Sequence, residues 1–445
     1  MAIGQLPADV SQWVKELSGS LHQRVAARLL PMLLGCLFAR GRRTVASWLR
    51  GADVGADFRA HYYFLGSLGR LVRWVALRLF RIVLQVVSPG ERLLFALDDT
   101  PTKRYGPCVE GAGIHHNPTP GPADQQFLYG HVWVTLALVA HHPLWGAIGL
   151  PLLGLLYVRQ KDIAPLTKWY KVRFQTKLEL AAQLFDWVAS ALHFLGKTVW
   201  IVCDGAYAKR PVLKAARKHG FVVVSRLRKD AALFSLPAPA PQHGPQRPGP
   251  KPKYGKQAIS LAKRAGHNQG WLTETFVLYG KSVAKTYKTF LATYPVVGGV
   301  LRVVLVRETT GWVAFFCTDP NATAAQILEA VADRATIEQD FHDLKEVHGL
   351  GQQQLRHYFA NIAAFHITAW LYTLVELWAW HQPKTQLCDR SASPWDDPER
   401  RPSHADRCKS LRRLCLQEQI AAAHTGPPIR GKFRTLLRRL VRLAA

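Results

Sequence analysis

The sequence predicts an α/β fold in which a mixed sheet is flanked by helices. Short apolar runs typical of strands follow one another at 93–97, 131–140 and 144–158. A helix–strand alternation comes next, over about 165–227, which is typical of an α/β unit. Helical patterns flank these stretches on both sides, so we expect helices to cover the sheet.

Residues 1–90 are expected to form a helical, basic region. Apolar residues recur there at helical spacing, as at Val25, Leu29, Leu33 and Leu37. Arg42 and Arg43 stand just before a short predicted helix that ends near Gly51, an arrangement suited to a helix that contacts DNA. The same helix could equally pack against its neighbours and leave its arginines in solvent.

Residues 91–230 are expected to hold the first part of the core. After three successive strands, which suggest a meander, a helix is predicted over about 165–195. The run TVWIVCD at 198–204 is rich in β-branched residues and predicts a strand that ends in a carboxylate. A basic helix at 211–219 and the strand FVVVSRL at 221–227 are predicted to follow.

An insertion is expected at 231–320. Its first part, 236–255, is rich in proline and predicts an exposed loop, because proline cannot donate the hydrogen bonds of a regular element. Residues 270–318 contain a series of strand-like runs, among them VLRVVLVRE and WVAFFCT. The insertion is therefore expected to be β-rich.

Helical patterns return at 321–383, which is expected to form the second part of the core. Helices are predicted at 322–348 and at about 359–380, the second rich in Trp and Leu and therefore buried. Residues 384–445 form a basic C-terminal tail that ends in KFRTLLRRLVRL. A basic amphipathic end of this kind could lie on DNA. The sequence does not decide whether this tail or the N-terminal helices recognise DNA.

The net charge points to a polyanionic partner. The chain has 58 Lys and Arg against 30 Asp and Glu, a formal net charge of +28 at pH 7. A compact fold tolerates this self-repulsion best when a polyanion neutralises it, so nucleic acid is the expected partner. A basic protein without such a ligand is the alternative.

The cysteines and the apolar stretches indicate the cellular compartment of the protein. The seven cysteines are scattered, odd in number and without a CxxC pair, which argues against a disulfide framework or a zinc ribbon and favours the cytoplasm. The longest apolar stretch, 144–158, is too short to span a bilayer, and the first residues lack a secretory signal. One further group could be imagined as a metal site but matches no standard spacing: Cys388, His404, Cys408 and Cys415.

Carboxylates stand at the ends of two predicted strands. LLFALDDT places Asp98 and Asp99 at the end of the first, and VWIVCDG places Asp204 at the end of another. Cleaving a phosphodiester needs a divalent metal to stabilise the attacking and leaving oxygens, and Mg²⁺ prefers carboxylate ligands. An aspartate that closes a strand is often only a turn residue. The chemical interpretation therefore depends on a third carboxylate.

The third carboxylate lies in the segment 332–351, which predicts a helix. At about 100° per residue, Arg334, Glu338 and Lys345 fall within about 40° of one another on one helix face. An apolar stripe adjoins that face: Ile337, Phe341 and Leu344. An exposed helix with surface ion pairs is the alternative interpretation of these charges.

The order of LLFALDDT, IVCDGAYA and RATIEQDFHDLKEVHGLGQQQLRH resembles that in DDE transposases of bacterial insertion sequences, in particular the IS4-like and IS701-like groups. The resemblance covers roughly residues 30–380. The third segment is close to the family's Tyr–Arg–Glu–Lys signature, with Arg334, Glu338 and Lys345 at three of its positions. Val331 stands where the tyrosine would be, which bears on any hairpin-forming excision step.

The resemblance implies an RNase H-like core with Asp98, Asp204 and Glu338 as catalytic residues and metal ligands. The family's first Asp is commonly followed two places later by Thr or Ser, which favours Asp98 with Thr100, whereas strand length also permits Asp99. Asp99 is therefore kept as a further expected metal ligand. The implied cofactor is Mg²⁺ in a two-metal site, with Mn²⁺ as the alternative ion.

The implied reaction is cut-and-paste DNA transposition, in which element ends are cut and the freed 3′-OH attacks target DNA. The implied partners are double-stranded DNA, as terminal inverted repeats and target, and a second copy of the chain, since two element ends must be brought together. The implied DNA contacts are Arg334 and Lys345 near the cut, and Lys209 and Arg210 beyond Asp204. The implied location is the prokaryotic cytoplasm, at the nucleoid.

Two other functions stay open from the sequence. A transposase-derived protein could bind DNA without activity, although all three carboxylate positions are filled. An RNase H-like nuclease could cut DNA without strand transfer, although the long insertion and the basic flanks favour an enzyme that holds two DNA ends.

Overall fold

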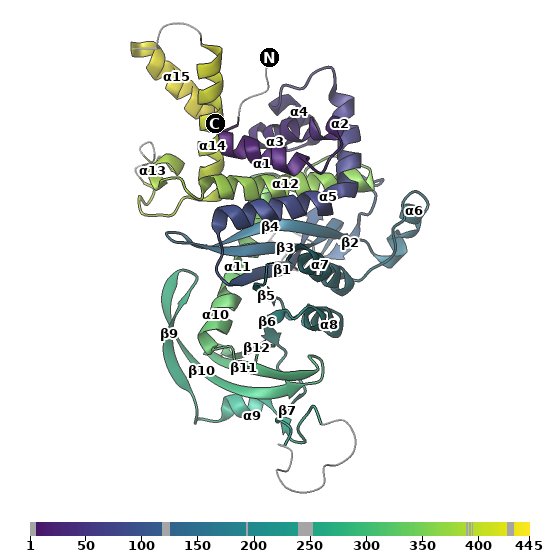
Figure 1. The fold of residues 1–445 in the computed structure, drawn as a ribbon, viewed down its shortest axis with the longest axis vertical. Helices are drawn as coiled ribbons and strands as arrows, with labels where there is room; N and C mark the ends of the chain where they lie inside the picture. The colour runs from purple at the N-terminus through teal and green to yellow at the C-terminus, as the bar shows by residue number, and fades with distance from the viewer. Residues whose placement is uncertain are drawn as a thin grey trace.

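Helices and strands alternate along the chain in the computed structural model (Figure 1). The structure describes the whole chain except residues 1–5, 118–124, 193–194, 239–251, 389, 391–392, 394 and 425–430. The helices are α1 (Ala8–Ser18), α2 (Gln23–Ala26), α3 (Leu29–Phe38), α4 (Val45–Gly51), α5 (Phe58–Val87), the short 3₁₀ helix η1 (Gln160–Asp162), α6 (Ala164–Thr167), α7 (Lys177–Leu192), α8 (Arg210–Lys218), α9 (Leu261–Gly266), α10 (Ala324–Asp333), α11 (Ala335–Glu346), α12 (Tyr358–Ala379), α13 (Lys384–Leu387), α14 (His404–Ala423) and α15 (Gly431–Ala444). The strands are β1 (Arg92–Lys103), β2 (Gly113–His116), β3 (Phe127–His142), β4 (Gly146–Tyr157), β5 (Thr198–Cys203), β6 (Val222–Leu227), β7 (Leu233–Phe234), β8 (Ala258–Ile259), β9 (Leu272–Leu278), β10 (Lys281–Tyr294), β11 (Gly299–Glu308) and β12 (Gly311–Cys317).

The described strands form one mixed sheet. Its order is β2-β3-β1-β5-β6-β12-β11-β10-β7-β8, with β4 also paired to β3 and β9 to β10. Strand β1 is parallel to β5, and β5 is parallel to β6, whereas β3 is antiparallel to both β1 and β4. The order β4-β3-β1-β5-β6 is therefore a mixed five-stranded unit, and it agrees with the α/β, RNase H-like core expected from the sequence.

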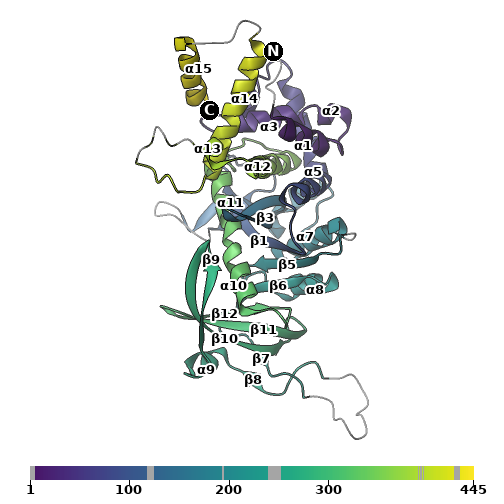
Figure 2. The same cartoon turned by 60° about the vertical axis from the view of Figure 1, so that its left-hand side comes forward.

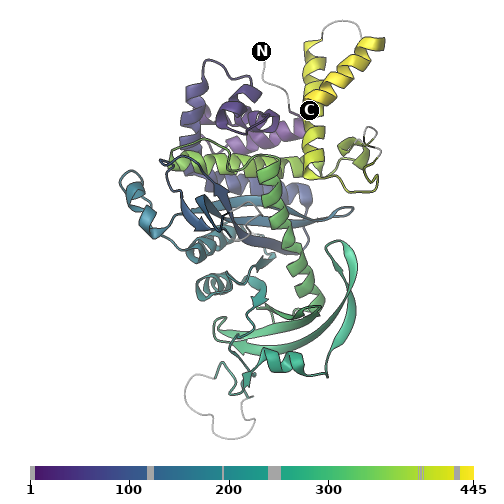
Figure 3. The same ribbon diagram turned by 180° about the vertical axis from the view of Figure 1, so that it is seen from behind.

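Helices cover both faces of this sheet. Helices α7 and α8 lie on one face, and α10 and α11 follow one another along the opposite face (Figures 2 and 3). Helices α5 and α12 pack together beside β4, and α1 to α4 lie beyond them (Figure 1). Strands β9 to β12 extend the sheet past β6, so the β-rich insertion continues the core sheet instead of forming a separate layer.

Helix α12 forms the centre of the helical part. Among the helices that the structure describes, it is the one long and apolar enough to cross a membrane by length and composition, and 94% of its apolar window is buried inside the protein. Trp370 donates its indole N–H to the carbonyl of Leu152, and Thr373 donates its hydroxyl to the carbonyl of Pro151. These contacts with β4 are typical of a core helix, as predicted for 359–380.

The helix predicted over 165–195 begins later than expected. Helix α6 is one turn long, and α7 begins only at Lys177. The backbone N–H of Glu179 donates to Oγ1 of Thr176 at 3.2 Å, and the backbone N–H of Thr176 donates to Oε2 of Glu179 at 2.7 Å. This reciprocal capping box satisfies donors that the first helical turn leaves free, and it sets the start of α7.

Other expectations differ in smaller ways. The helix predicted over 322–348 is divided at Arg334 into α10 and α11. The Pro-rich segment 236–255 falls largely outside the described residues, so its predicted loop is not described. The short strands β2, β7 and β8 escaped prediction because two to four residues are too few for a visible alternation.

Candidate active site

Asp98 and Asp204 come together through the pairing of two parallel strands. Leu97 on β1 lies opposite Cys203 on β5, so the two aspartates follow at neighbouring positions. Strand β5 ends there as predicted. The prediction that the first strand also ends at Asp98 and Asp99 was wrong, because pairing with β3 continues β1 to Lys103. Because both strands are apolar and buried up to this point, their carboxylates emerge at the same edge of the core.

The guanidinium of Arg334 holds the third carboxylate next to the first. Its Nη1 donates to Oδ2 of Asp98 at 2.8 Å, and its Nη2 lies 2.7 Å from Oε1 of Glu338. Arg334 stands at the junction of α10 and α11, one turn before Glu338. The apolar stripe predicted for this helix is buried: Ile337, Phe341 and Leu344. The charged face predicted beside that stripe therefore meets β1 at Asp98.

Asp98 and Glu338 differ in exposure. Glu338 keeps 56% of its side chain exposed, against 21% for Asp98. Burial raises the pKa of Asp98 to about 6, and the charges of Asp99 and Asp204 act in the same direction, while the Asp99 N–H and Arg334 lower it. A partly buried carboxylate with a raised pKa beside other acids is typical of sites that bind cations or carry chemistry.

Asp99 does not lie with these carboxylates. Successive side chains of a strand point to opposite faces, so Asp99 faces α7 while Asp98 faces α11. Lys177 donates from Nζ to Oδ2 of Asp99 at 2.6 Å, and Tyr207 donates its hydroxyl to Oδ1 at 2.6 Å. Asp99, which was expected as a further metal ligand, is thus bound by the Lys177 ammonium and the Tyr207 hydroxyl on the other face of the sheet. Tyr207 and Lys177 are contacts that strand-end patterns alone could not reveal.

Lys345 lies further along the helix that carries Glu338. It is half-buried, and burial lowers its pKa, with the charge of Lys103 acting in the same direction. Lys103 ends β1, and Arg334 faces Asp98 earlier on the same strand, so α11 follows β1 from the carboxylates toward its end. Arg334, which precedes α11, and Lys345, near its end, therefore lie at opposite ends of this stretch.

Arg42 and Arg43, expected to contact DNA, have different environments. Arg42 is exposed, with its guanidinium carbon 5.8 Å from the centre of the Tyr105 ring. Arg43 is half-buried, its backbone N–H donates to Oε1 of Gln352 at 2.8 Å, and burial together with Arg412 lowers the pKa of its side chain. The following helix α4 packs its buried face on α3.

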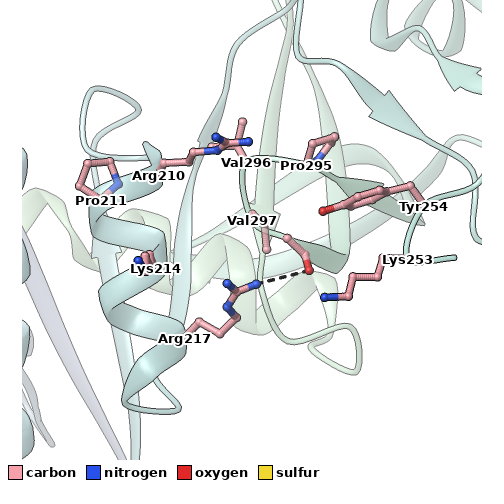
Figure 4. Close-up of a pocket in the computed structure, with 10 residues that line it drawn as sticks. Arg210, Pro211, Lys214, Arg217, Lys253, Tyr254, Pro295, Val296 and Val297 are labelled. Atoms are coloured by element: carbon pink, nitrogen blue, oxygen red, sulfur yellow. Dashed lines mark hydrogen bonds between the residues drawn. The ribbon is translucent and has the colours of Figure 1, made fainter. Parts of the chain in front are cut away.

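A basic pocket of about 530 Å³ lies beside α8, where Lys209 and Arg210 were expected to contact DNA (Figure 4). Lys209 precedes α8 at the N-cap position, and Arg210 is the first residue of the helix. Arg210, Lys214 and Arg217 recur at helical spacing along one side of the pocket. Across from them lie Lys253, Tyr254 and the turn 295–298 (Figure 4). Among the described residues that line the pocket, none is acidic.

The helical spacing of the α8 cations could have revealed one side of this pocket from the sequence. The presence of Lys253 in the pocket could not be predicted, because Lys253 lies in a different segment of the chain. Arg104, the residue after β1, faces the interior. Arg104 is buried and donates to the carbonyls of Gly351 and Gln353, at 2.7 and 3.0 Å. That arginine therefore fastens the segment after α11 to the end of β1.

Comparison with known proteins gives one family. A family model described as DDE superfamily endonuclease matches residues 16–275. The matched range is more than half of the chain and includes Asp98 and Asp204, and it ends before α11. No curated protein matches the chain.

Proposed function

Because the chain belongs to the DDE superfamily endonuclease family, we propose that it is a DNA transposase. In this proposal it cuts DNA at the ends of an insertion sequence and joins the freed 3′-OH to target DNA. The observation that carries the proposal is the grouping of Asp98, Asp204 and Glu338 around Arg334 at the end of the parallel strand pair. We assign the catalytic role to these three carboxylates.

The donor set fits a divalent metal ion. Mg²⁺ prefers carboxylate oxygens, and Asp98, Asp204 and Glu338 supply them from three separate elements. Burial and neighbouring acids disfavour the ionised form of Asp98, a cost that a cation would offset. These three residues would hold Mg²⁺, or Mn²⁺ as the alternative. Such ions stabilise the charge on the attacking and leaving oxygens of a phosphodiester.

Arg334 and the cations along α11 would position the DNA backbone. A guanidinium presents a planar pair of donors that matches the oxygens of a phosphate as well as those of a carboxylate. Arg334 is 24% exposed, so it is accessible from the strand ends. The half-buried Lys345 and the exposed Arg42 would add further contacts with phosphates.

The pocket beside α8 supports a second contact with DNA. Arg210, Lys214 and Arg217 present three cations along about two helical turns, a spacing comparable to that of successive phosphates. The net charge of +28 favours the same partner. We further propose double-stranded DNA as the substrate and a homodimer as the acting species, since two ends must be held together for transposition.

The test is cleavage of DNA that carries the ends flanking this gene, with Mg²⁺, by wild type and by Glu338→Gln. We expect the variant to lose cleavage and to keep DNA binding. Glu91→Gln is the matched control, because Glu91 is an exposed acid at the opposite end of β1, and it should cleave like wild type. If wild type binds its own DNA ends tightly but does not cut them, the proposed cleavage activity is contradicted.

Strand transfer is tested separately with pre-cut ends and a supercoiled target. Joined products that disappear in Glu338→Gln are expected for a transposase. Efficient cleavage without joined products would instead favour a nuclease, the second function that the sequence leaves open.

A further inference from the structure

Two histidines and one cysteine meet in the interior, between the end of α11 and the start of α14. The ligand atoms of His348, His404 and Cys408 all lie within 4.8 Å of one another, and all three residues are buried. The two Nε2 atoms are 2.7 Å apart, and Sγ of Cys408 lies 3.3 Å from Nε2 of His404 and 3.8 Å from Nε2 of His348. The cluster shares no residue with the carboxylate site.

Local structure explains how the three side chains converge. His404 and Cys408 are four residues apart on α14, so they share one face of the helix. His348 follows α11 and is positioned by a tight helix end, in which Gly349 has a φ of 64° and the N–H of Leu350 donates to the carbonyl of Leu344. In the sequence, His404 and Cys408 were grouped with Cys388 and Cys415 as conceivable metal ligands. His348 was not part of that group.

We propose that His348, His404 and Cys408 form a structural zinc site that fastens α14 to the end of the catalytic helix. Imidazole nitrogen and thiolate sulfur are the donors that Zn²⁺ prefers, at about 2.0–2.1 Å and about 2.3 Å. Tetrahedral donors at those lengths are about 3.3–3.6 Å apart. Both sulfur–nitrogen separations are close to this range, and the two nitrogens would move apart by about half an ångström.

The surroundings of His404 match those of a metal-binding histidine. Its Nδ1 lies 2.6 Å from Oε1 of Glu376, so the Nδ1 proton is held by a carboxylate and Nε2 is left to face the cluster. Arg407 pairs with the same carboxylate. The Tyr372 ring stacks on His404 with centroids 4.0 Å apart, which fixes the plane of the imidazole. Carboxylate support of this kind orients a ligand and raises its basicity.

His348 also faces the other two donors. Its Nε2 lies 2.7 Å from Nε2 of His404 and 3.8 Å from Sγ of Cys408. A hydrogen bond between the two imidazoles would need one of the facing Nε2 atoms to carry a proton. In the proposed site the zinc ion takes the place of that proton, and Cys408 contributes a thiolate.

The site would connect three helices that lie far apart in the chain. His348 follows the helix that carries Glu338, His404 and Cys408 begin α14, and Glu376 belongs to α12 (Figure 2). A bound ion would therefore hold the C-terminal helices against the core and stabilise the far end of α11. Its role is structural, because burial of all three ligands leaves no access for a substrate.

The first test is the metal content of the full-length protein, produced with zinc and desalted without a chelator, by plasma mass spectrometry. We expect about one zinc ion per chain in wild type and in Glu338→Gln, and loss of zinc in His348→Gln and Cys408→Ser. Cys415→Ser is the matched control, because Cys415 is a buried thiol on the same helix outside the cluster, and it should retain zinc. Folded wild-type protein without zinc would overturn the proposal.

A second measurement keeps the test valid if a variant fails to fold. Cobalt added to metal-free wild type should give the visible absorption of a tetrahedral ion together with a thiolate-to-cobalt charge-transfer band. Carboxylates cannot give that band, so the result is independent of metal bound at Asp98, Asp204 and Glu338. A folded protein that binds cobalt without the thiolate band would also contradict the site.

Discussion

Arg334 donates to Oδ2 of Asp98 at 2.8 Å, although the two residues are 236 positions apart in the chain. This contact places the start of α11 over the end of the parallel pair β1–β5. Since Arg334 also pairs with Glu338, one guanidinium keeps two anions together that would otherwise repel each other. Arg334 thus holds Asp98 and Glu338 close together, and its planar guanidinium also matches the oxygens of a phosphate.

Replacing Arg334 is expected to impair catalysis more than binding. Arg334→Ala removes the fork between Asp98 and Glu338, and cleavage should fall about 100-fold, the scale for losing one preorganised charge contact. Arg334→Lys keeps the charge but not the planar pair of donors, so it should restore little. Single-turnover cleavage and DNA affinity are the measurements. Arg228→Ala is the control, since Arg228 pairs with Asp230 at the surface, and equal losses in both variants would contradict the assignment.

The two adjacent aspartates should behave differently. Asp98→Asn is expected to abolish cleavage, because an amide cannot replace a charged ligand. Asp99→Asn should instead lower the free energy of unfolding by about 1–3 kcal/mol, because it weakens the contacts with Lys177 and Tyr207. Urea unfolding and cleavage per folded molecule separate the two effects. Loss of cleavage in a stable Asp99→Asn protein would reverse the assignment.

Cleavage should depend on pH through Asp98. Its pKa is raised to about 6, and only the ionised carboxylate can hold a cation, so activity is expected to decline as the pH falls through about 6. Metal and proton compete for the carboxylate, so more Mg²⁺ should move the midpoint to lower pH. Rates between about pH 5 and about pH 8 at two Mg²⁺ concentrations test this. A midpoint that does not respond to Mg²⁺ would argue against Asp98 as a ligand.

The α8 pocket should contribute to DNA affinity without sequence preference. Lys214→Ala is expected to weaken binding to all sequences and to reduce the slope of log affinity against log salt by roughly 0.9. Lys218→Ala is the matched control, because Lys218 is on the same helix but outside the pocket, where it pairs with Asp186. Fluorescence anisotropy at several salt concentrations measures both. Identical slopes in the two variants would exclude a specific role for the pocket.

Arg42 and Arg43 should separate binding from stability. Arg42→Ala is expected to weaken DNA binding and leave the melting temperature unchanged, because Arg42 is exposed. Arg43→Ala removes a half-buried side chain beside α14 and should lower the melting temperature by several degrees, about 1–2 kcal/mol. Thermal unfolding combined with a binding titration distinguishes them. A melting temperature lowered equally by both changes would contradict the difference in burial.

Local patterns in the sequence predicted most of the longer helices and strands. Apolar runs that end in LDD and in CDG predicted β1 and β5, because a strand's burial pattern is written in its own residues. The spacing of Arg334, Glu338 and Lys345 predicted a charged helix face, because residues at helical spacing lie on the same side of a helix. The α/β class and the family followed from these segments. The start of α7 was missed because the cap of Thr176 and Glu179, not apolar periodicity, determines it.

Tertiary structure decided what depends on contacts between distant segments. Whether Asp98 or Asp99 pairs with Arg334 follows from which face of β1 meets α11, and a run of two aspartates does not contain that information. His348 joins His404 and Cys408 because α11 ends where α14 begins, 56 positions later in the chain. Chain spacing records neither relationship, since packing free energy depends on surfaces that meet only after the chain has folded. The sequence by itself determined the kinds of residue available for chemistry, and folding determined which of them lie together.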